Sequence, residues 1–292
     1  MEGTQSVKYA APVTVEEAQH LLASDEEAQV FAGATDLIPQ IRAGRKQPPL
    51  TVDLKRIPRL VNMRVEGNTW VIGAAVSAAQ LSSNPDLAVD FPGMTEAAAL
   101  IGSDQIQSRA TLGGNLCNAS PAADTVPAMI VNGAVGVIAT SEGTRMVPVS
   151  DIAIGPGSTC LAPGEFLLEL LVERPPLRTA DAYLRFIPRT EMDIAVVGAA
   201  ARVTLAEDGV VESSRIAIGA VAPTVLRVDE AEAALAGRVI DDDLLDEIAT
   251  AASERGSPIT DKRGTADFRR HVVGVLTKRV VAAAAQRAGG SQ

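Results

Sequence analysis

The sequence has few of the residues on which nucleophilic or metal-based catalysis usually depends. Its 292 residues include two histidines and two cysteines. Cys117 and Cys160 do not form a metal-ligand spacing such as C-x-x-C, so free thiols in a reducing compartment are expected. His20 and His271 are far apart and lie in segments with helical patterns, so structural roles are expected for both. The chain therefore has almost no residues that could support histidine-based nucleophilic catalysis.

Aromatic residues, basic runs and long apolar runs are also scarce. Aromatics make up 3% of the chain and the net charge is −10, which disfavours a nucleic-acid partner. The longest apolar runs are much shorter than a membrane span, so no transmembrane segment is expected. The N-terminus is polar and lacks the apolar run of a signal peptide. These absences predict a cytoplasmic protein.

The remaining composition is that of an ordinary globular protein with enough apolar mass for real cores. Hydrophobic residues make up 47% of the chain and charged residues 21%. A chain of this length contains roughly two domains on average. The pair Pro175-Pro176 interrupts the pattern and marks the expected boundary between residues 1–176 and residues 177–292.

Hydrophobic periodicity and capping signals predict a mixed α+β protein. Ser77 and Gln80 form a capping box, as do Thr14 and Glu17. The expected helices cover residues 14–23, 37–41, 92–101, 124–131, 228–235, 242–255 and 266–285. The expected strands cover residues 28–31, 50–54, 61–65, 69–75, 135–139, 144–149, 166–172, 183–187, 194–204 and 214–221. On the last helix, one face is expected to carry Phe268, Val272, Val275, Leu276, Arg279 and Ala283.

A stretch of small residues, 32–37 (Ala-Gly-Ala-Thr-Asp-Leu), lies between an expected strand and an expected helix. Such a bend presents free backbone N–H groups, and the helix dipole adds to them, so it can bind an anion such as phosphate. The alternative is a plain turn in which Thr35 or Asp36 caps the helix. The stretch does not match G-x-G-x-x-G, so a Rossmann fold is not supported.

A second stretch, residues 108–128, is expected to be a long loop with a function. Gly113 and Gly114 are adjacent, so the backbone there can adopt positive φ and no side chain projects from it. Asn115 and Asp124 supply short polar groups that bond to backbone or ligand. The alternative is an ordinary surface turn, because glycine pairs also mark turns.

Together with residues 192–195, 219–223 and 268–271, the two small-residue stretches resemble the FAD-binding medium subunit of molybdenum hydroxylases. This family includes the medium subunit of carbon monoxide dehydrogenase and the flavin domain of xanthine dehydrogenase, and the resemblance covers nearly the whole chain. It implies a two-part FAD-binding domain of the vanillyl-alcohol-oxidase (PCMH) type, with subdomains of about 1–57 and 58–176. It also implies a C-terminal α+β domain with a three-stranded antiparallel sheet and helices.

The resemblance implies a non-covalent FAD site with no catalytic residue and no metal ligand on this chain. Residues 32–37 would wrap the pyrophosphate, and residues 111–115 would contact the flavin, ribityl and phosphate region. Asp124 would hold a polar part of the cofactor, and Arg185 would lie near the flavin. The implied set is Ala32, Gly33, Ala34, Thr35, Asp36, Leu37, Ile101, Thr111, Leu112, Gly113, Gly114, Asn115, Asp124, Leu167 and Arg185.

Two positions of the first stretch set conditions on the FAD site. Ala34 stands where relatives often have glycine, so the backbone there must accept a Cβ atom. Asp36 is acidic beside the expected phosphates, and it fits only if its side chain caps the following helix.

In this family the organic substrate is hydroxylated at a molybdenum cofactor on a large molybdopterin subunit. Electrons pass through two [2Fe-2S] clusters on a small iron-sulfur subunit to the FAD, and then to an external acceptor. The resemblance thus implies a dimer of heterotrimers, with peripheral attachment to the inner membrane face left open. Two cysteines cannot supply a four-thiolate cluster, so this chain alone is not expected to hydroxylate the substrate.

Two other interpretations remain. The chain could be a self-contained flavin oxidase or dehydrogenase, although it has few aromatics to line a substrate pocket. It could also be a non-enzymatic module that has lost its flavin, although Gly113, Gly114, Asn115 and Asp124 are all retained. The substrate of the complex and its final electron acceptor stay open.

Overall fold

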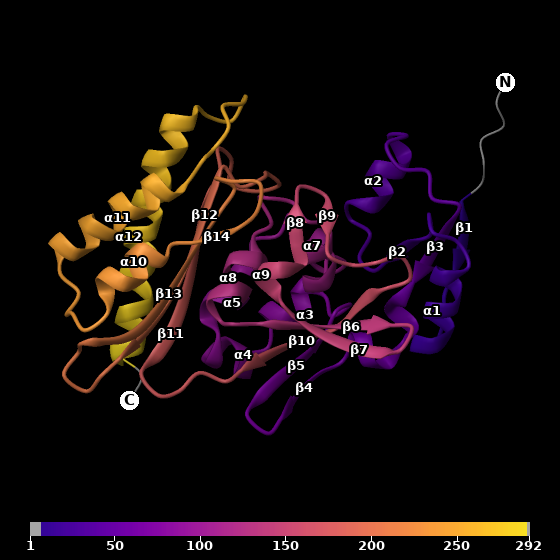
Figure 1. The fold of residues 1–292 in the computed structure, drawn as a ribbon, viewed down its shortest axis with the longest axis horizontal. Helices are drawn as coiled ribbons and strands as arrows, with labels where there is room; N and C mark the ends of the chain where they lie inside the picture. Colours follow the sequence, from indigo (N-terminus) through magenta and orange to yellow (C-terminus); the bar gives the residue numbers. More distant parts are fainter. Residues whose placement is uncertain (1–6, 291–292) are drawn as a thin grey trace.

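The computed structural model describes residues 7–290, which form three main sheets placed one after another along the molecule (Figure 1). Residues 1–6 and 291–292, at the outer ends of the two expected domains, lie outside this range. No helix in the described range is long and apolar enough to cross a membrane.

The first sheet is small, parallel and three-stranded, in the order β1-β3-β2. Thr14 begins the first helix by accepting a hydrogen bond from the backbone N–H of Glu17, as its capping sequence predicts. Buried Ala18 and Leu22 on that helix pack with Val52 of the central strand. The elements are β1 (Lys8–Ala10), α1 (Val15–Ala23), β2 (Gln29–Phe31), α2 (Leu37–Arg42), β3 (Leu50–Asp53), η1 (Leu54–Arg56) and η2 (Pro58–Val61).

The second sheet is antiparallel and five-stranded, in the order β4-β5-β10-β6-β7. Its strands are β4 (Met63–Glu66), β5 (Thr69–Gly73), β6 (Val135–Thr140), β7 (Gly143–Pro148) and β10 (Phe166–Glu173). The segments between them contain α3 (Ala78–Ser82), α4 (Pro85–Asp90), α5 (Pro92–Ala99), α6 (Asp104–Gln107), α7 (Leu112–Cys117), α8 (Thr125–Val131), α9 (Val149–Ile152), β8 (Ala153–Gly155) and β9 (Ser158–Thr159).

The central strand β10 connects two hydrophobic cores. Phe166 and Leu168 face the core beneath the first sheet, while Leu167 and Leu170 face the core formed with the middle helices. Successive side chains of a strand point to opposite faces, and a register shift between Leu167 and Glu169 changes this alternation, so one strand can serve both cores. This explains why β10 reads as a nearly continuous apolar run in the sequence.

The third sheet is antiparallel and four-stranded, so the expected three-stranded sheet is wrong by one strand. The additional strand is β14 (Leu226–Arg227), which pairs with Ala217 and Ile218. Two residues are too few to show a hydrophobic period, so the sequence gives no signal for it. The other elements are β11 (Thr179–Phe186), β12 (Val197–Leu205), β13 (Val211–Gly219), α10 (Asp229–Leu235), α11 (Asp242–Arg255) and α12 (Ala266–Gly290).

Helices cover both faces of the third sheet. α12 packs against β11 and β12, whereas α5 and α8 of the preceding region pack against β11, β12 and β13 from the other side. Ala199, Ala200 and Ala201 of β12 are fully buried, and their small side chains allow close approach on both faces. The C-terminal sheet is therefore held tightly to α5, which precedes the second small-residue stretch, and to α8, which begins within it.

The buried face of α12 differs from the expected one. Of the predicted face only Leu276 is buried, and Phe268 is 40% exposed. The buried positions are Arg269, Val273, Gly274, Leu276, Thr277, Val280, Val281, Ala284 and Ala288. α12 packs against the sheet and α11 together, and Gly274 lies so close to α11 that an added Cβ would stand 2.7 Å from the Ala249 carbonyl oxygen.

Candidate cofactor site

The first small-residue stretch forms a tight bend between β2 and α2. Ala34 has φ of +56°, which is the left-handed backbone conformation. This conformation is costly for a residue with a Cβ atom, yet the backbone accepts alanine at a position where relatives often have glycine. Within the described residues, the backbone N–H groups of residues 33–37 donate to no protein acceptor. Five free N–H groups at one bend form a concave donor surface suited to an anion.

The side chain of Asp36 does not cap α2, although the fit of this residue beside a phosphate required such a cap. It occupies the N-cap position of α2, but its side chain makes no capping hydrogen bond. Instead its carboxyl group lines the cleft described below, where desolvation raises its pKa. The expected capping role is therefore wrong, and the free N–H groups of the bend remain available.

The second stretch is not a continuous loop, because α7 begins inside it. Thr111 is the N-cap and its hydroxyl accepts a 2.9 Å hydrogen bond from the Gly114 N–H. Neither Gly113 nor Gly114 has positive φ, so the expected backbone freedom is wrong. Gly113 is required for packing, since an added Cβ would stand 2.5 Å from the Ala74 carbonyl oxygen. A glycine pair alone does not distinguish close approach from left-handed conformation.

The two stretches are in direct contact. A Cβ atom added at Gly33 would collide with the carbonyl oxygen of Arg109 and stand 3.0 Å from the Cα atom of Ala110. They line one cleft of about 500 Å³, a size within the range of about 300–1,000 Å³ typical of small-molecule sites. The predicted residues in its lining are Ala32, Gly33, Ala34, Thr35, Asp36, Leu37, Ile101, Thr111, Gly113, Gly114, Asn115 and Leu167.

Three predicted residues lie outside that lining. Leu112 is fully buried in the core of the middle region. The Asp124 carboxylate accepts hydrogen bonds from the Tyr183 hydroxyl (2.8 Å) and from Nη1 of Arg185 (2.7 Å). Burial raises the pKa of Asp124, although Arg185 and Tyr183 favour its ionised form. Cofactor contacts by these three residues stay predictions.

Four charged side chains line the cleft in the described structure: Glu26, Asp36, Lys46 and Glu165. Arg145 neutralises Glu165 through two hydrogen bonds of 2.9 and 2.7 Å, and this pairing lowers the pKa of Glu165. Nζ of Lys46 lies 3.4 Å from Oε1 of Gln29. Lys46 is thus the one cation among the lining residues.

Several lining residues were not expected from the sequence. Gln29, Lys46, Asn118 and Thr159 come from a strand, a surface loop, a helix end and a short hairpin. They show no common pattern, because they meet only through the packing of the first sheet on the middle region. The capping signal at Thr111 was the one local feature that could have revealed α7.

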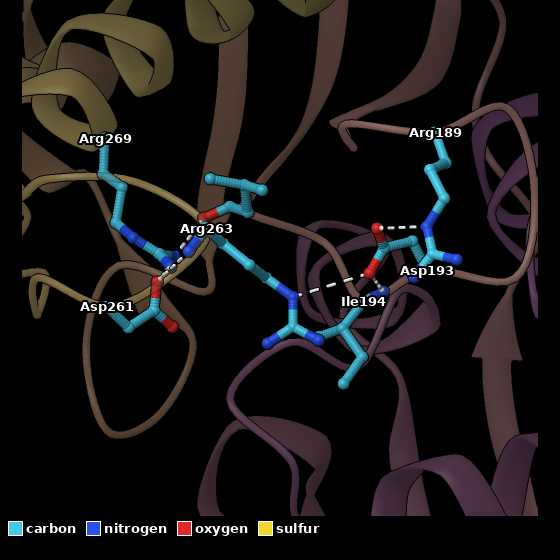
Figure 2. A network of polar contacts seen from close by, with 7 residues as sticks. Arg189, Asp193, Ile194, Asp261, Arg263 and Arg269 are labelled. Carbon is cyan, nitrogen blue, oxygen red and sulfur yellow. Dashed lines mark hydrogen bonds and ion pairs between the residues drawn. The ribbon is translucent and has the colours of Figure 1, made fainter.

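Residues 192–195, also part of the resemblance, lie in the loop between β11 and β12. Met192 has φ of +55°. Asp193 fixes the loop by accepting hydrogen bonds from Nε of Arg189 (3.3 Å), Nε of Arg263 (3.5 Å) and the Ile194 N–H (2.8 Å), as Figure 2 shows. Asp261 in turn pairs with buried Arg269 on α12. The loop is therefore tied to the segment that precedes α12.

The cleft has the chemical groups that FAD requires. Free N–H groups at residues 33–37 suit a pyrophosphate, and Ile101 and Leu167 supply apolar surface for a ring system. The glycines leave no side chain between the two stretches. Apart from Asp36, whose side chain makes no cap, the lining residues thus fit the cofactor that the resemblance implies.

Comparisons with known proteins identify the family of this chain. Residues 5–174 match the family model described as the FAD binding domain in molybdopterin dehydrogenase. Residues 182–284 match the CO dehydrogenase flavoprotein C-terminal domain. Together the two models span nearly all of the chain.

Individual relatives match over their full lengths. The carbon monoxide dehydrogenase medium chain of Afipia carboxidovorans is 34% identical, covering 97% of this chain and 98% of that one. The 6-hydroxypseudooxynicotine dehydrogenase complex subunit alpha of Paenarthrobacter nicotinovorans is 31% identical over 97% of this chain and 96% of its own length. The structure of carbon monoxide dehydrogenase from Hydrogenophaga pseudoflava that lacks the Mo-pyranopterin moiety superposes with a TM-score of 0.93, at 34% identity and with coverages of 96% and 98%.

Fold and cleft define an FAD-binding oxidoreductase subunit. More particularly, the chain belongs to the FAD-binding medium subunits of molybdenum hydroxylases, the family of the carbon monoxide dehydrogenase medium chain and the xanthine dehydrogenase FAD-binding subunit.

Proposed function

We propose that this chain binds FAD non-covalently and transfers electrons from [2Fe-2S] clusters on a partner subunit to an external acceptor. The observation that carries the proposal is the contact between the two small-residue stretches, which makes one cleft from segments far apart in the sequence. The 15 residues that the resemblance implies are proposed as the cofactor site, with Leu112, Asp124 and Arg185 acting from outside the lining.

The chain's own residues bind and orient the cofactor. The N–H groups of residues 33–37 would hold the pyrophosphate, and Ile101 and Leu167 would exclude water from the ring system. A bound flavin supplies the capacity to accept and release electrons. The Oδ1 atom of Asn115 accepts from the Thr125 hydroxyl at 2.7 Å, which orients the amide, and Nδ2 donates to no protein acceptor among the described residues, so it could donate to the cofactor.

The proposed complex contains a large molybdopterin subunit and a small iron-sulfur subunit, assembled as a dimer of heterotrimers in the cytoplasm. Support comes from relatives that are medium chains of carbon monoxide dehydrogenase and nicotine 6-hydroxylase. It also comes from the sequence, whose two cysteines cannot hold an iron–sulfur cluster of four thiolates.

A flavin assay of the purified full-length chain tests this proposal. We expect a visible flavin spectrum, release of FAD on denaturation, and no bleaching by organic substrates. Mixing with the reduced iron–sulfur and molybdenum subunits should bleach the flavin. Bleaching by one organic substrate without partner chains would instead identify a self-contained dehydrogenase, and failure to bind added FAD would identify a module without flavin.

The site itself can be tested with a matched pair of glycine variants. Gly33→Ala should abolish FAD retention, because its Cβ atom collides with the Arg109 carbonyl oxygen and separates the two stretches. Gly155→Ala is the control, since an added Cβ there meets no atom within 4 Å and its φ is not positive. Flavin-to-protein ratio after gel filtration is the readout. Full occupancy in the Gly33→Ala variant would contradict the site assignment.

A further inference from the structure

A second groove of about 730 Å³ is lined by residues of the middle region and of the C-terminal sheet. It includes Arg174 and Pro176, which lie in the segment that connects β10 with β11 (the strands are labelled in Figure 1). It shares no lining residue with the FAD cleft. One wall comes from β6, β10 and the α8–β6 turn, the other from β12 and β13. Its lining residues include Asn132, Gly133, Glu173, Arg174, Arg202 and Arg215.

Two arginines lie side by side on the C-terminal wall of this groove. Arg202 on β12 and Arg215 on β13 are direct cross-strand partners. Residues in such a pair have Cβ atoms about 4.5–5.5 Å apart, and like charges placed opposite one another are destabilising. Burial lowers the pKa of Arg202, and the charge of Arg215 lowers it further, against the smaller opposing effects of Asp181 and Glu173. An anion between the two guanidinium groups would relieve this repulsion.

Protein groups in the described range leave these two cations largely unpaired. Arg215 makes no hydrogen bond or ion pair there, and Arg202 makes one long hydrogen bond of 3.5 Å to the Asn132 carbonyl oxygen. Asp181, the partner of Arg202 on its other side, already accepts from two backbone N–H groups and from Asn132. Its carboxylate is therefore committed elsewhere.

Backbone and charged side chains surround the arginine pair. Gly133 has φ of +67°, and a Cβ atom there would collide with Nη1 of Arg215, so the guanidinium lies against bare backbone. Arg174, at the groove edge, is held by Asp90 through hydrogen bonds of 2.8 and 3.2 Å. Glu173 and Glu212 also line the groove, so its lining has three arginines and two glutamates among the described residues.

We propose that this groove binds a phosphate-bearing small molecule, with its phosphate held between Arg202 and Arg215. Guanidinium groups are planar donor forks that recognise phosphate oxygens bidentately, and two of them opposite each other can share one tetrahedral anion. The occupant touches both domains and the linker that joins them, so its binding stabilises their arrangement.

Binding of inorganic phosphate to the FAD-saturated full-length chain tests this inference. Saturation with FAD removes the bends of the first cleft as competing phosphate sites. We expect a saturable rise in melting temperature and broadening of the ³¹P resonance, relative to chloride at equal ionic strength. Arg202→Gln and Arg215→Gln should each raise the phosphate dissociation constant roughly tenfold, since each removes a charge-assisted contact.

Arg238→Gln is the control, because Arg238 pairs with Glu247 on the exposed surface of the same domain. It should leave phosphate binding unchanged. Without phosphate, Arg215→Gln should keep or raise the melting temperature, because it removes like-charge repulsion. The inference is overturned if wild-type protein shows no saturable response, if the Arg238→Gln variant loses as much affinity as the groove variants, or if Arg215→Gln lowers the melting temperature in chloride.

Discussion

Asp124 is the residue whose surroundings differ most from a simple cofactor contact. It stands at the N-cap of α8, yet its carboxylate binds Tyr183 and Arg185 of β11. The Arg185 side chain is 5% exposed, and its Nε atom has no hydrogen-bond partner in the described structure. The ion pair therefore joins the FAD-binding region to the C-terminal sheet.

Replacing Asp124 should destabilise the protein strongly. Asp124→Ala leaves the buried Arg185 charge uncompensated, and breaking a buried pair in this way costs about 3–5 kcal/mol. Urea unfolding measures the loss. Tyr183→Phe is the control and should cost less, about 1.5–3 kcal/mol, because it removes one hydrogen bond to the ionised carboxylate and keeps the ion pair.

The same Asp124→Ala variant tests the predicted cofactor contact when it is studied below its melting temperature. If the carboxylate also binds FAD, affinity for FAD should fall by about 1–3 kcal/mol. An unchanged dissociation constant would remove Asp124 from the cofactor site and leave it a purely structural role.

At the scale of elements, β10 holds the edge of the middle sheet through one buried acid. Glu169 is 2% exposed and accepts hydrogen bonds from Arg59 of η2 (2.5 Å) and Arg64 of β4 (2.9 Å). Burial by itself would raise the pKa of Glu169, but the two arginines outweigh it, so the pKa is lowered. Three elements thus depend on one ionised carboxylate.

The lowered pKa of Glu169 gives stability a defined pH dependence. Its contribution is fully present above the pKa of an unfolded glutamate, about 4.3, and is lost as pH falls through the lower folded-state pKa. Glu169→Gln should lower the free energy of unfolding by about 3–5 kcal/mol at pH 7. The difference in unfolding free energy between the variant and wild type should become smaller in acid.

Unfolding free energies measured across this acid range check the prediction. Glu66→Gln is the matched control, because Glu66 also pairs with Arg64 but is 62% exposed, so a loss of about 0–1 kcal/mol is expected. A gap between wild type and Glu169→Gln that stays constant down to strong acid would show that Glu169 is not ionised in the folded protein.

At the scale of the whole molecule, contacts between the FAD-binding region and the C-terminal sheet go beyond apolar packing. Asp181 of β11 accepts from the N–H groups of Gly93 and Met94 at the start of α5, at 2.8 and 3.0 Å. Arg287 near the end of α12 donates to the Asp181 carbonyl oxygen at 2.8 Å and pairs with Glu96 of α5. One strand therefore caps a helix that belongs to the other region.

Removing this cap should weaken coupling between the two regions. Asp181→Ala leaves two backbone donors without their acceptor, each of which costs about 1–3 kcal/mol if it stays buried. Nδ2 of Asn132 keeps only its bond to the Ala128 carbonyl oxygen. We expect a lower melting temperature and separation of one calorimetric transition into two. Asp267→Ala, at a side chain 94% exposed, should change neither. A single unshifted transition in Asp181→Ala would mean that apolar packing alone couples the regions.

Local signals in the sequence determined much of this protein. The capping box of Ser77 and Gln80 is present as predicted, and α11 begins and ends at the predicted residues. The first small-residue stretch also lies between a strand and a helix, as predicted. Caps and turns depend on groups within a few residues of each other, so their physics is readable without knowledge of the fold.

Only the tertiary structure decided which distant groups meet. The contact of Gly33 with Arg109, the partners of Asp124 and the opposition of Arg202 and Arg215 all join residues far apart in the chain. Strand β14 and the buried face of α12 likewise depend on what packs against them. These features follow from strand pairing and from close packing between elements, which the local pattern of one segment does not encode.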